Sequence, residues 1–240
     1  MSVRVLSSGD TALVVEFGDR IDRALSERVL ALRARVDQAD IAGVIETVPT
    51  FRSLMVHYDP LRVGAAGLKA VIETLLEGAV SPNQKRRLWR VPVCYEGELA
   101  PDLDEVGERT GLGTSEVAAL HASARYHVYM VGFLPGYPYM GDLPRPLHLP
   151  RRADPRVRVP PGSVAIATGM TAIYPVESPA GWHLIGTTPI RIFDPGVQPP
   201  ALFAPGDAVE FEAIGRAAFD RLRAAAENGE HRLAPSDIAE

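Results

Sequence analysis

The sequence predicts an α+β protein with a small N-terminal α/β domain over residues 1–84 and a larger β-rich domain over residues 85–215. A C-terminal helix and tail occupy residues 216–240. The first domain repeats the order strand, strand, helix, which is typical of helices packed on one face of a small sheet. Fourteen of the 21 prolines lie between residues 131 and 200, and proline is excluded from helix interiors and central strands. Many short strands separated by Gly and Pro turns therefore indicate a barrel or sandwich in the second domain.

Hydrophobic periodicity places two helices in the N-terminal domain. Residues 21–39 carry apolar side chains at three- and four-residue steps, which gives one buried stripe, and Asp19 or Asp22 can cap the start of this helix. A second apolar stripe predicts a helix over residues 65–77. The polar, turn-prone Ser81–Gln84 is the predicted domain boundary. Strands are predicted at Val3–Leu6, Ala12–Phe17, Val44–Val48 and Leu54–Tyr58.

The second half contains short helices and many short strands. Helices are predicted over residues 102–110, over residues 115–122 with Thr114 as the cap, and more weakly over residues 215–226. Residues after Asn228 are predicted to form a frayed tail. The predicted strands are Arg87–Tyr95, Arg125–Val131, Val157–Val159, Val164–Ala167, Leu184–Ile185, Ile190–Phe193 and Val209–Phe211.

Composition excludes several classes of function. The net charge is −5, whereas a general nucleic-acid binder needs a basic face, so we expect no nucleic-acid partner. The N-terminus lacks a basic region followed by a long apolar stretch, and no run approaches the roughly 20 apolar residues of a membrane span, so we expect no membrane partner. Cys94 is the single cysteine and is expected to be a buried core thiol. A cytoplasmic protein is the resulting prediction.

No self-contained catalytic or metal-binding motif is present. There is no GxxxxGK[ST] or GxGxxG sequence for nucleotide binding, no GxSxG nucleophile, and no paired histidine or cysteine spacing for a metal. The six histidines are expected to have satisfied structural roles, with His183, beside Trp182, as the exception kept for a binding site. Catalytic residues therefore remain unassigned, and no metal is expected.

The run Gly132–Gly141, with the sequence GFLPGYPYMG, is the first candidate site. Alternating proline and glycine restricts φ at some positions and frees it at others, which shapes a defined loop. Phe133, Pro135 and Tyr137 then offer apolar surfaces with polar tips to a ligand or partner. The alternative is a packed structural loop without a binding role.

An arginine group is the second candidate site. Five arginines face only two aspartates over residues 142–158, a local balance of 5 − 2 = +3 in an acidic protein. Guanidinium groups bind carboxylate or phosphate through two parallel hydrogen bonds. The alternative is simple solvation of a strand edge. The five are Arg145, Arg151, Arg152, Arg156 and Arg158.

Four long motifs in the second half resemble the allophanate hydrolase subunit 1 family. They are GFLPGYPYMGDL, PRRADPRVRVPPGSVAIAT, TAIYPVESPAGWHLIGTTPIRIFDP and APGDAVEF. This family includes the histidine-kinase inhibitor KipI and the bacterial 5-oxoprolinase subunit PxpB, and the similarity covers roughly residues 3–215. The resemblance implies that the second domain is a cyclophilin-like β-barrel of the carboxyltransferase type.

The resemblance implies three possible functions. The favoured one is the B subunit of an ATP-dependent 5-oxoprolinase, which opens 5-oxo-L-proline to L-glutamate with A-type and C-type 5-oxoprolinase proteins as partners. ATP would be bound by the complex, because this chain has no nucleotide motif. The second is a KipI-like inhibitor that binds the dimerisation and phosphotransfer domain of a sensor histidine kinase. The third is the carboxyltransferase half of an allophanate hydrolase or urea carboxylase-type enzyme.

The enzyme-subunit hypothesis predicts an arginine-lined pocket that is completed by a partner. Arg151, Arg156 and Arg158 would stabilise phosphate charge, with Tyr174 and Trp182 as walls. A pocket converging on arginines favours the enzyme subunit, whereas a broad exposed apolar patch favours the kinase inhibitor. The chain is expected to be inactive alone, because it lacks a recognisable base–nucleophile pair.

Met170 departs from the pattern of the resembled family. Members usually carry glutamine at this position, and replacing an amide removes two hydrogen-bond donors and an acceptor. Substrate choice would differ here if that glutamine contacts ligand. The neighbouring Thr171 and the exceptional His183 complete the set of predicted ligand- or partner-binding residues.

Overall fold

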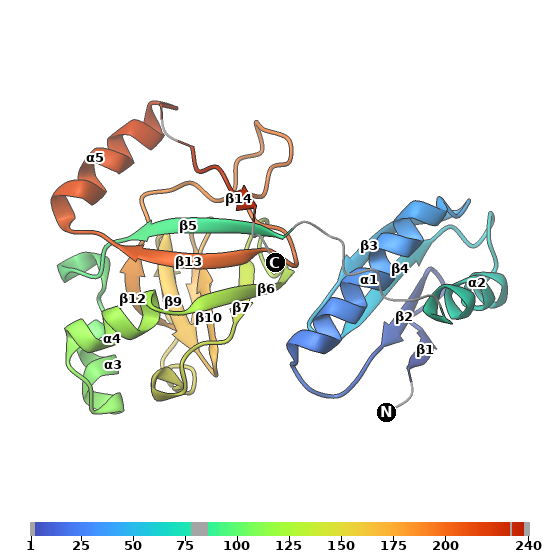
Figure 1. The fold of residues 1–240 in the computed structure, drawn as a ribbon, viewed down its shortest axis with the longest axis horizontal. Coiled ribbons are helices and arrows are strands. Elements are labelled where there is room, and N and C mark those ends of the chain that lie inside the picture. Colours follow the sequence, from blue (N-terminus) through green and yellow to red (C-terminus); the bar gives the residue numbers. More distant parts are fainter. Residues whose placement is uncertain (1–2, 78–85, 231, 238–240) are drawn as a thin grey trace. The chain divides into compact units, whose positions relative to one another are not determined.

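The computed structural model describes residues 3–77, 86–230 and 232–237 and divides into two compact units, Met1–Lys85 and Arg86–Glu240 (Figure 1). The predicted boundary at Ser81–Gln84 lies outside the described residues. The chain is a mixed α and β protein with a small sheet in the first unit and a large sheet in the second.

The first unit is a four-stranded antiparallel sheet in the order β1-β2-β4-β3, packed against α1 and α2. The elements are β1 Arg4–Ser7, β2 Ala12–Glu16, α1 Arg23–Ala39, β3 Val44–Pro49, β4 Ser53–Tyr58 and α2 Ala65–Glu77. The cap of α1 is Asp22, whose carboxylate accepts a hydrogen bond of 3.3 Å from the Leu25 amide. The predicted apolar stripe of α1 is buried at Val29, Leu32 and Val36 against Leu54 and Val56 of the sheet.

The second unit is built on an eight-stranded sheet in the order β12-β9-β10-β7-β6-β13-β5-β14, with a separate ribbon of β8 and β11. Its strands are β5 Arg87–Val93, β6 Arg125–Val131, β7 Pro138–Gly141, β8 Arg156–Val159, β9 Ser163–Ala167, β10 Met170–Ile173, β11 Ser178–Ala180, β12 His183–Thr187, β13 Ala208–Ala213 and β14 Ser236–Asp237. Its helices are α3 Leu103–Thr110, α4 Thr114–Ala122 and α5 Arg216–Glu227, with short 3-10 turns at Gly97–Leu99 and Arg145–Leu147.

Strands β9, β10 and β12 separate two hydrophobic cores. Because successive side chains of a strand point to opposite faces, Val164 and Ile166 join the main core, whereas Ala165 and Ala167 join a second, aromatic core. The alanines on this second face leave room for bulky rings contributed by the loops above it. This arrangement positions the candidate site.

The large sheet does not close by continuous strand pairing among the described residues. β12 and the end of β5 meet through one isolated bridge, in which the Cys94 and Thr187 amides donate to each other's carbonyls at 2.9 and 3.0 Å. A Cβ on Gly186 would lie 2.7 Å from Val93 Cγ1 and 3.1 Å from the Cys94 carbonyl oxygen, so this approach requires glycine. The cyclophilin-like barrel stays a prediction. Cys94 itself is buried, as predicted.

Three local predictions are wrong. Ile190–Phe193 is an irregular hairpin arm with one bridge, Phe193 to Ala201, because prolines at 189 and 195 interrupt the ladder. The cap of α4 is Gly113, whose amide donates to the Glu116 carboxylate at 2.7 Å. The tail after Asn228 returns to the sheet, where β14 pairs with β5.

Candidate functional site

An aromatic cluster lies on the second face of the sheet. Tyr137, Tyr139, Tyr174 and Trp182 make edge-on ring contacts, with centroids 4.9 Å apart for Tyr137 and Tyr139 and 5.1 Å for Tyr137 and Tyr174. The Trp182 ring is 6.3 Å from Tyr137 and 6.1 Å from Tyr139. Edge-to-face pairs of this kind contribute roughly 0.5–1.5 kcal/mol each beyond area burial. Tyr137, Tyr174 and Trp182 are buried, whereas Tyr139 is partly exposed.

The GFLPGYP loop covers this cluster and carries an exposed aromatic side chain at its tip. The Tyr137 amide donates to the Leu134 carbonyl and the Gly132 amide to the Tyr137 carbonyl, both at 3.1 Å, which closes the loop. Phe133 has a φ of 71° and is 66% exposed. Left-handed φ is uncommon for a bulky residue and costs about 1–3 kcal/mol. The fold therefore holds an aromatic ring in solvent at an energetic cost, which is typical of a recognition surface.

Arg151 is the cation beside these rings. Burial raises the pKa of Tyr137, Tyr139 and Tyr174 above their ordinary value, and the charge of Arg151 partly opposes the rise in all three. The phenols are therefore protonated at neutral pH. Arg151 is exposed and forms no ion pair with any carboxylate in the described part of the chain.

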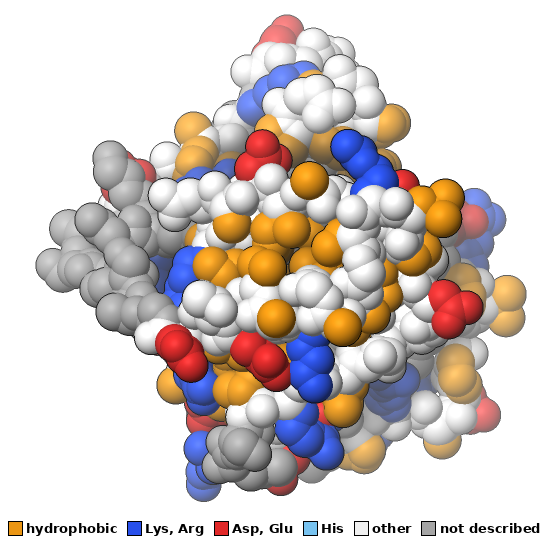
Figure 2. Space-filling model, turned by 90° about the vertical axis from the view of Figure 1, so that its right-hand side faces the viewer, with side chains coloured by type: hydrophobic (Ala, Val, Ile, Leu, Met, Phe, Trp, Pro, Cys, Tyr) orange, Lys and Arg blue, Asp and Glu red, His pale blue; other side chains and the backbone are white. Residues whose placement is uncertain are grey.

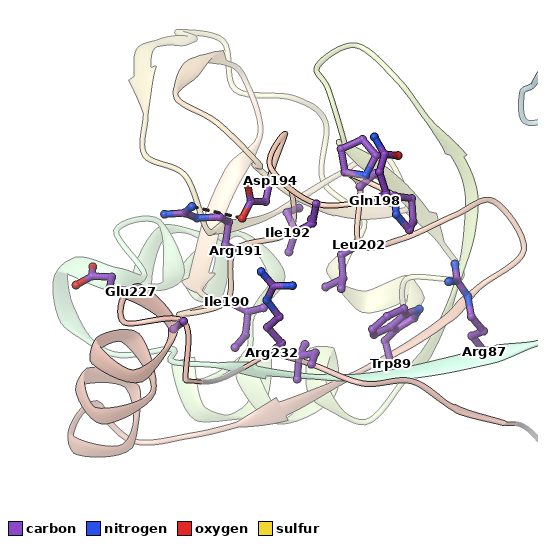
Figure 3. Close-up of a pocket in the computed structure, with 17 residues that line it drawn as sticks. Arg87, Trp89, Ile190, Arg191, Ile192, Asp194, Gln198, Leu202, Glu227 and Arg232 are labelled. Carbon is purple, nitrogen blue, oxygen red and sulfur yellow. Dashed lines mark ion pairs between the residues drawn. The ribbon is translucent and has the colours of Figure 1, made fainter.

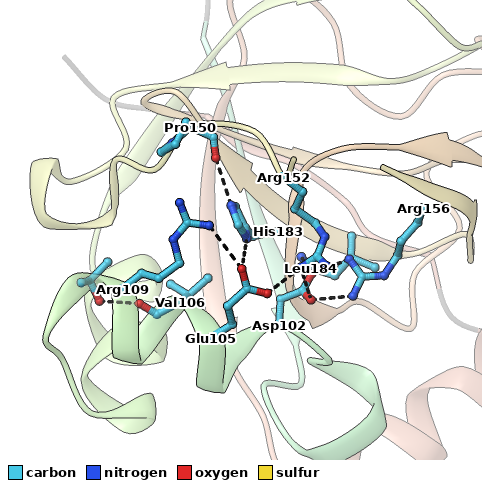
Figure 4. Close-up of polar contacts among 10 residues, drawn as sticks. Asp102, Glu105, Val106, Arg109, Pro150, Arg152, Arg156, His183 and Leu184 are labelled. Carbon is cyan, nitrogen blue, oxygen red and sulfur yellow. Dashed lines mark hydrogen bonds and ion pairs between the residues drawn. The ribbon is translucent and has the colours of Figure 1, made fainter. Parts of the chain in front are cut away.

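A buried carboxylate fixes the segment that carries Arg151 (Figure 4). Asp102, at the start of α3, accepts hydrogen bonds from Arg156 at 2.7 and 2.5 Å, from Arg152 at 3.0 Å and from the Leu184 amide at 2.6 Å. The Asp102 side chain is only 3% exposed. Because Arg152 is the next residue along the chain, this clamp determines where Arg151 emerges.

His183 lies within the same network. Its Nε2 donates to the Pro150 carbonyl at 3.0 Å, and its Nδ1 is 3.8 Å from the Glu105 carboxylate (Figure 4). Burial alone would raise the pKa of Glu105, but hydrogen bonds from Arg152 and Arg109 outweigh burial and lower it. His183 is 0% exposed, so it orders the segment from inside.

Thr171 belongs to a separate buried chain of hydrogen bonds. Its hydroxyl donates to the Ala165 carbonyl at 3.1 Å and accepts from His121 Nε2 at 2.9 Å, while the Tyr95 hydroxyl donates to His121 Nδ1 at 2.7 Å. Burial lowers the pKa of His121 to about 3, so its ring is neutral. Thr171 is fully buried, and its position favours a packing role over ligand contact.

The predicted arginine-lined pocket is not formed by the residues proposed for it. Arg156 is held by Asp102, and Arg158 forms a 2.5 Å ion pair with Glu177 and points to solvent with 77% of its side chain exposed. Tyr174 and Trp182 are 1% and 5% exposed, so they are core residues and cannot serve as open walls. The local excess of arginine suggested free anion-binding groups, but Asp102 pairs with Arg152 and Arg156, and Glu177 pairs with Arg158.

The surface that remains accessible is the aromatic face, which we define by Phe133, Leu134, Tyr139, Arg151 and Met170. Leu134, Tyr139 and Met170 pack partly exposed against the buried rings, and Phe133 contacts Tyr137 edge-on at 5.7 Å. Pro135 is exposed beside Phe133 at the tip of the loop. Met170, the departure noted in the sequence, is therefore at this surface.

Comparison with known proteins places the chain in a family. The family described as carboxyltransferase domain, subdomain C and D, matches residues 3–203. The chain belongs to this family. It is 39% identical to the 5-oxoprolinase B subunit of Bacillus subtilis over 86% of this chain and 90% of that protein. It is 37% identical to the 5-oxoprolinase B subunit of Escherichia coli O157:H7 over 85% of this chain and 92% of that protein.

Solved structures agree with this placement. The crystal structure of TTHA0988 matches 89% of this chain at 36% identity with a TM-score of 0.76, and this chain spans 40% of that protein. The Kluyveromyces lactis urea amidolyase structure matches 98% of this chain with a TM-score of 0.79. The two sequences are 20% identical and this chain spans 16% of that protein, so the match supports the fold alone.

The described residues contain neither a metal-binding cluster nor a membrane-spanning helix. No three His, Cys, Asp or Glu side chains in residues 3–77, 86–230 and 232–237 are grouped so that they could hold a metal ion. Across the same residues, no helix has the length and apolarity needed to cross a membrane.

Proposed function

We propose that this chain is the B subunit of an ATP-dependent 5-oxoprolinase, which opens 5-oxo-L-proline to L-glutamate, and that it is inactive alone. The observation that carries the proposal is the identity of 37–39% to three proteins named as 5-oxoprolinase B subunits, over at least 77% of this chain. The word subunit in those names supports partner chains, which we propose to be A-type and C-type 5-oxoprolinase proteins.

The chemistry explains why such a protein needs partners. A lactam is resonance-stabilised, and transfer of the ATP γ-phosphoryl group to its oxygen, with loss of ADP, activates the ring carbon. Water adds to that carbon, the C–N bond breaks to open the ring, and a second water releases phosphate. Charge developing on the phosphoryl oxygens requires fixed cations. This chain contributes Arg151, while ATP is bound at the level of the complex.

The aromatic face is the proposed contact with the partner. Exposed aromatic residues at the centre of an interface, surrounded by partly buried apolar groups, are typical binding hot spots. Phe133 meets this description because it is held exposed in a strained conformation. Arg151 lies beside the same rings, so docking there would bring its guanidinium to the edge of a shared active site. In this proposal the aromatic face is supported from below or beside it by Pro135, Tyr137, Tyr174, Trp182 and His183.

A kinase-inhibitor function is the second candidate, because it uses an exposed apolar surface without requiring a pocket. Figure 2 looks at the side on which Figure 1 draws the first unit, and hydrophobic side chains gather there near the centre of the face, bordered by charged side chains, so this patch is distinct from the aromatic face of the second unit. Large exposed apolar patches mark interaction sites. Under this alternative, a KipI-like mode would place a helical domain of a sensor histidine kinase on the apolar, aromatic loops of the second unit, where Phe133 is exposed.

The carboxyltransferase alternative has weaker support. The chain is 26% identical to urea amidolyase of Saccharomyces cerevisiae and covers 14% of that protein. We also propose that the second unit is a cyclophilin-like barrel and that the protein is cytoplasmic.

Co-purification of the tagged full chain from its native cell tests the proposed function. Recovery of a C-type 5-oxoprolinase protein, which is lost when Phe133 is replaced by alanine, is the expected result. Recovery of a sensor kinase with no such partner would overturn the proposal in favour of the inhibitor.

A further inference from the structure

A pocket of about 360 Å³ lies in the second unit, and none of the residues that line it belongs to the aromatic face (Figure 3). One wall is the hairpin of residues 190–202, and the other is the segment between the end of α5 and β14. Its volume is in the range of sites for small molecules. The family match ends at residue 203, so the C-terminal wall comes from chain beyond the family motifs.

The floor of the pocket is apolar. Trp89, Ile190 and Ile192 are at most 5% exposed, and Leu202 and Leu233 are partly buried beside them. The Trp89 indole is fixed, because its Nε1 donates to Asp207 at 2.9 Å. A ligand seated here must therefore have an apolar body that covers these side chains.

Among the arginines that line the pocket, Arg87 and Arg191 pair with carboxylates, whereas Arg232 pairs with none of the described residues. Arg87 binds both Asp207 oxygens at 2.8 and 2.7 Å, and Arg191 is 3.7 Å from Asp194. Arg232 has no hydrogen bond or ion pair with any residue in the described part of the chain. Figure 3 shows Arg232 extending from the C-terminal segment among the apolar side chains of the pocket.

We propose that this pocket binds a small organic carboxylate with an apolar body. A single planar guanidinium matches one carboxylate through two parallel hydrogen bonds. A phosphate dianion would call for more than one free cation, and the other two arginines are already neutralised by aspartates. The site goes beyond the proposed function, because it requires no partner protein and no ATP.

A fluorescence titration of the isolated full chain tests this proposal. Trp89 lines the pocket and Trp182 is the only other tryptophan, so the W182F variant reports on the pocket alone. Excitation at about 295 nm, where phenyl ligands do not absorb, follows binding of three matched probes: 4-phenylbutyrate, 4-phenylbutan-1-ol and 4-phenylbutylamine. The carboxylate is expected to bind about tenfold more tightly than the alcohol, since a charged hydrogen bond is lost in the alcohol, and the amine most weakly.

Substitution of Arg232 tests whether this residue binds the carboxylate of the ligand. R232Q is expected to weaken 4-phenylbutyrate binding about tenfold, to the level of the alcohol, whereas R221Q, at an exposed arginine of α5 outside the pocket, leaves it unchanged. Thermal unfolding of each variant confirms that the fold is retained. Equal affinity for the three probes, no binding of any, or an unaffected R232Q variant would each overturn the proposal. None of these outcomes bears on assembly with the A-type and C-type proteins, so the two proposals fail separately.

Discussion

Removal of the Asp102 charge tests whether the buried clamp holds the segment that carries Arg151. Asp102→Asn keeps the shape of the side chain but leaves Arg152 and Arg156 without their shared carboxylate. Their side chains are 21% and 26% exposed, so water can solvate the unpaired guanidinium groups only in part. Breaking a buried ion pair from one side costs about 3–5 kcal/mol. Arg152 retains Glu105 at 2.6 Å, which places the expected loss at the lower end, about 3 kcal/mol.

Urea unfolding followed by tryptophan fluorescence measures this loss. Both tryptophans, Trp89 and Trp182, lie in the second unit, so the signal reports the unit that contains the clamp. A loss of about 3 kcal/mol corresponds to a decrease of roughly 6–12 °C in Tm for a unit of this size. Glu177→Gln is the matched control, because its partner Arg158 is 77% exposed and exposed pairs contribute about 0–1 kcal/mol. A loss below 1 kcal/mol for Asp102→Asn, or one equal to that of the control, would refute the reasoning.

Three further predictions concern single residues. Phe133→Ala should weaken partner binding by about 2 kcal/mol, or about 30-fold, while the isolated chain keeps its stability within about 0.5 kcal/mol; calorimetric titration of the partner checks this, and an unchanged Kd contradicts it. Met170→Gln should lower KM for 5-oxo-L-proline in the complex roughly two- to tenfold by restoring one hydrogen bond, and steady-state kinetics with an unchanged KM would place this position away from substrate. His121 is neutral when folded down to about pH 3 but protonates near pH 6.5 when unfolded, so stability is lost as pH falls below 6.5. Urea unfolding at pH 7 and pH 5 should show about 2 kcal/mol of this loss, and the same loss in His121→Gln would assign it to other groups.

The first unit was predictable because its signals are local. The α1 stripe, the Asp22 cap and the short turns between strands all depend on residues a few positions apart, and the structure has the predicted order of elements. In the second unit β10 was missed, because Met170–Ile173 is too short for its alternation to stand out. β7 was missed because it begins at Pro138, which is tolerated as the first residue of a strand.

The site was less predictable because its contacts are long-range. Asp102 binds groups 50, 54 and 82 positions away, and nothing in one sequence links those positions. The arginine excess was visible, but its neutralisation by a residue at the start of α3 was not. Tyr174 and Trp182 have both an apolar body and a polar tip, so their composition fits a core as well as a pocket wall. The Pro and Gly spacing predicted a defined loop that presents Phe133, but the left-handed φ of Phe133 was not predicted.

The most direct measurement is the rate of ATP-dependent L-glutamate formation from 5-oxo-L-proline, with the full chain alone and with purified A-type and C-type 5-oxoprolinase proteins. The chain alone should give no glutamate, the complete set should give ATP-dependent turnover, and Arg151→Gln should reduce turnover without preventing assembly. Glutamate formation by the isolated chain, or full activity of a set from which this chain is omitted, would contradict the proposed role.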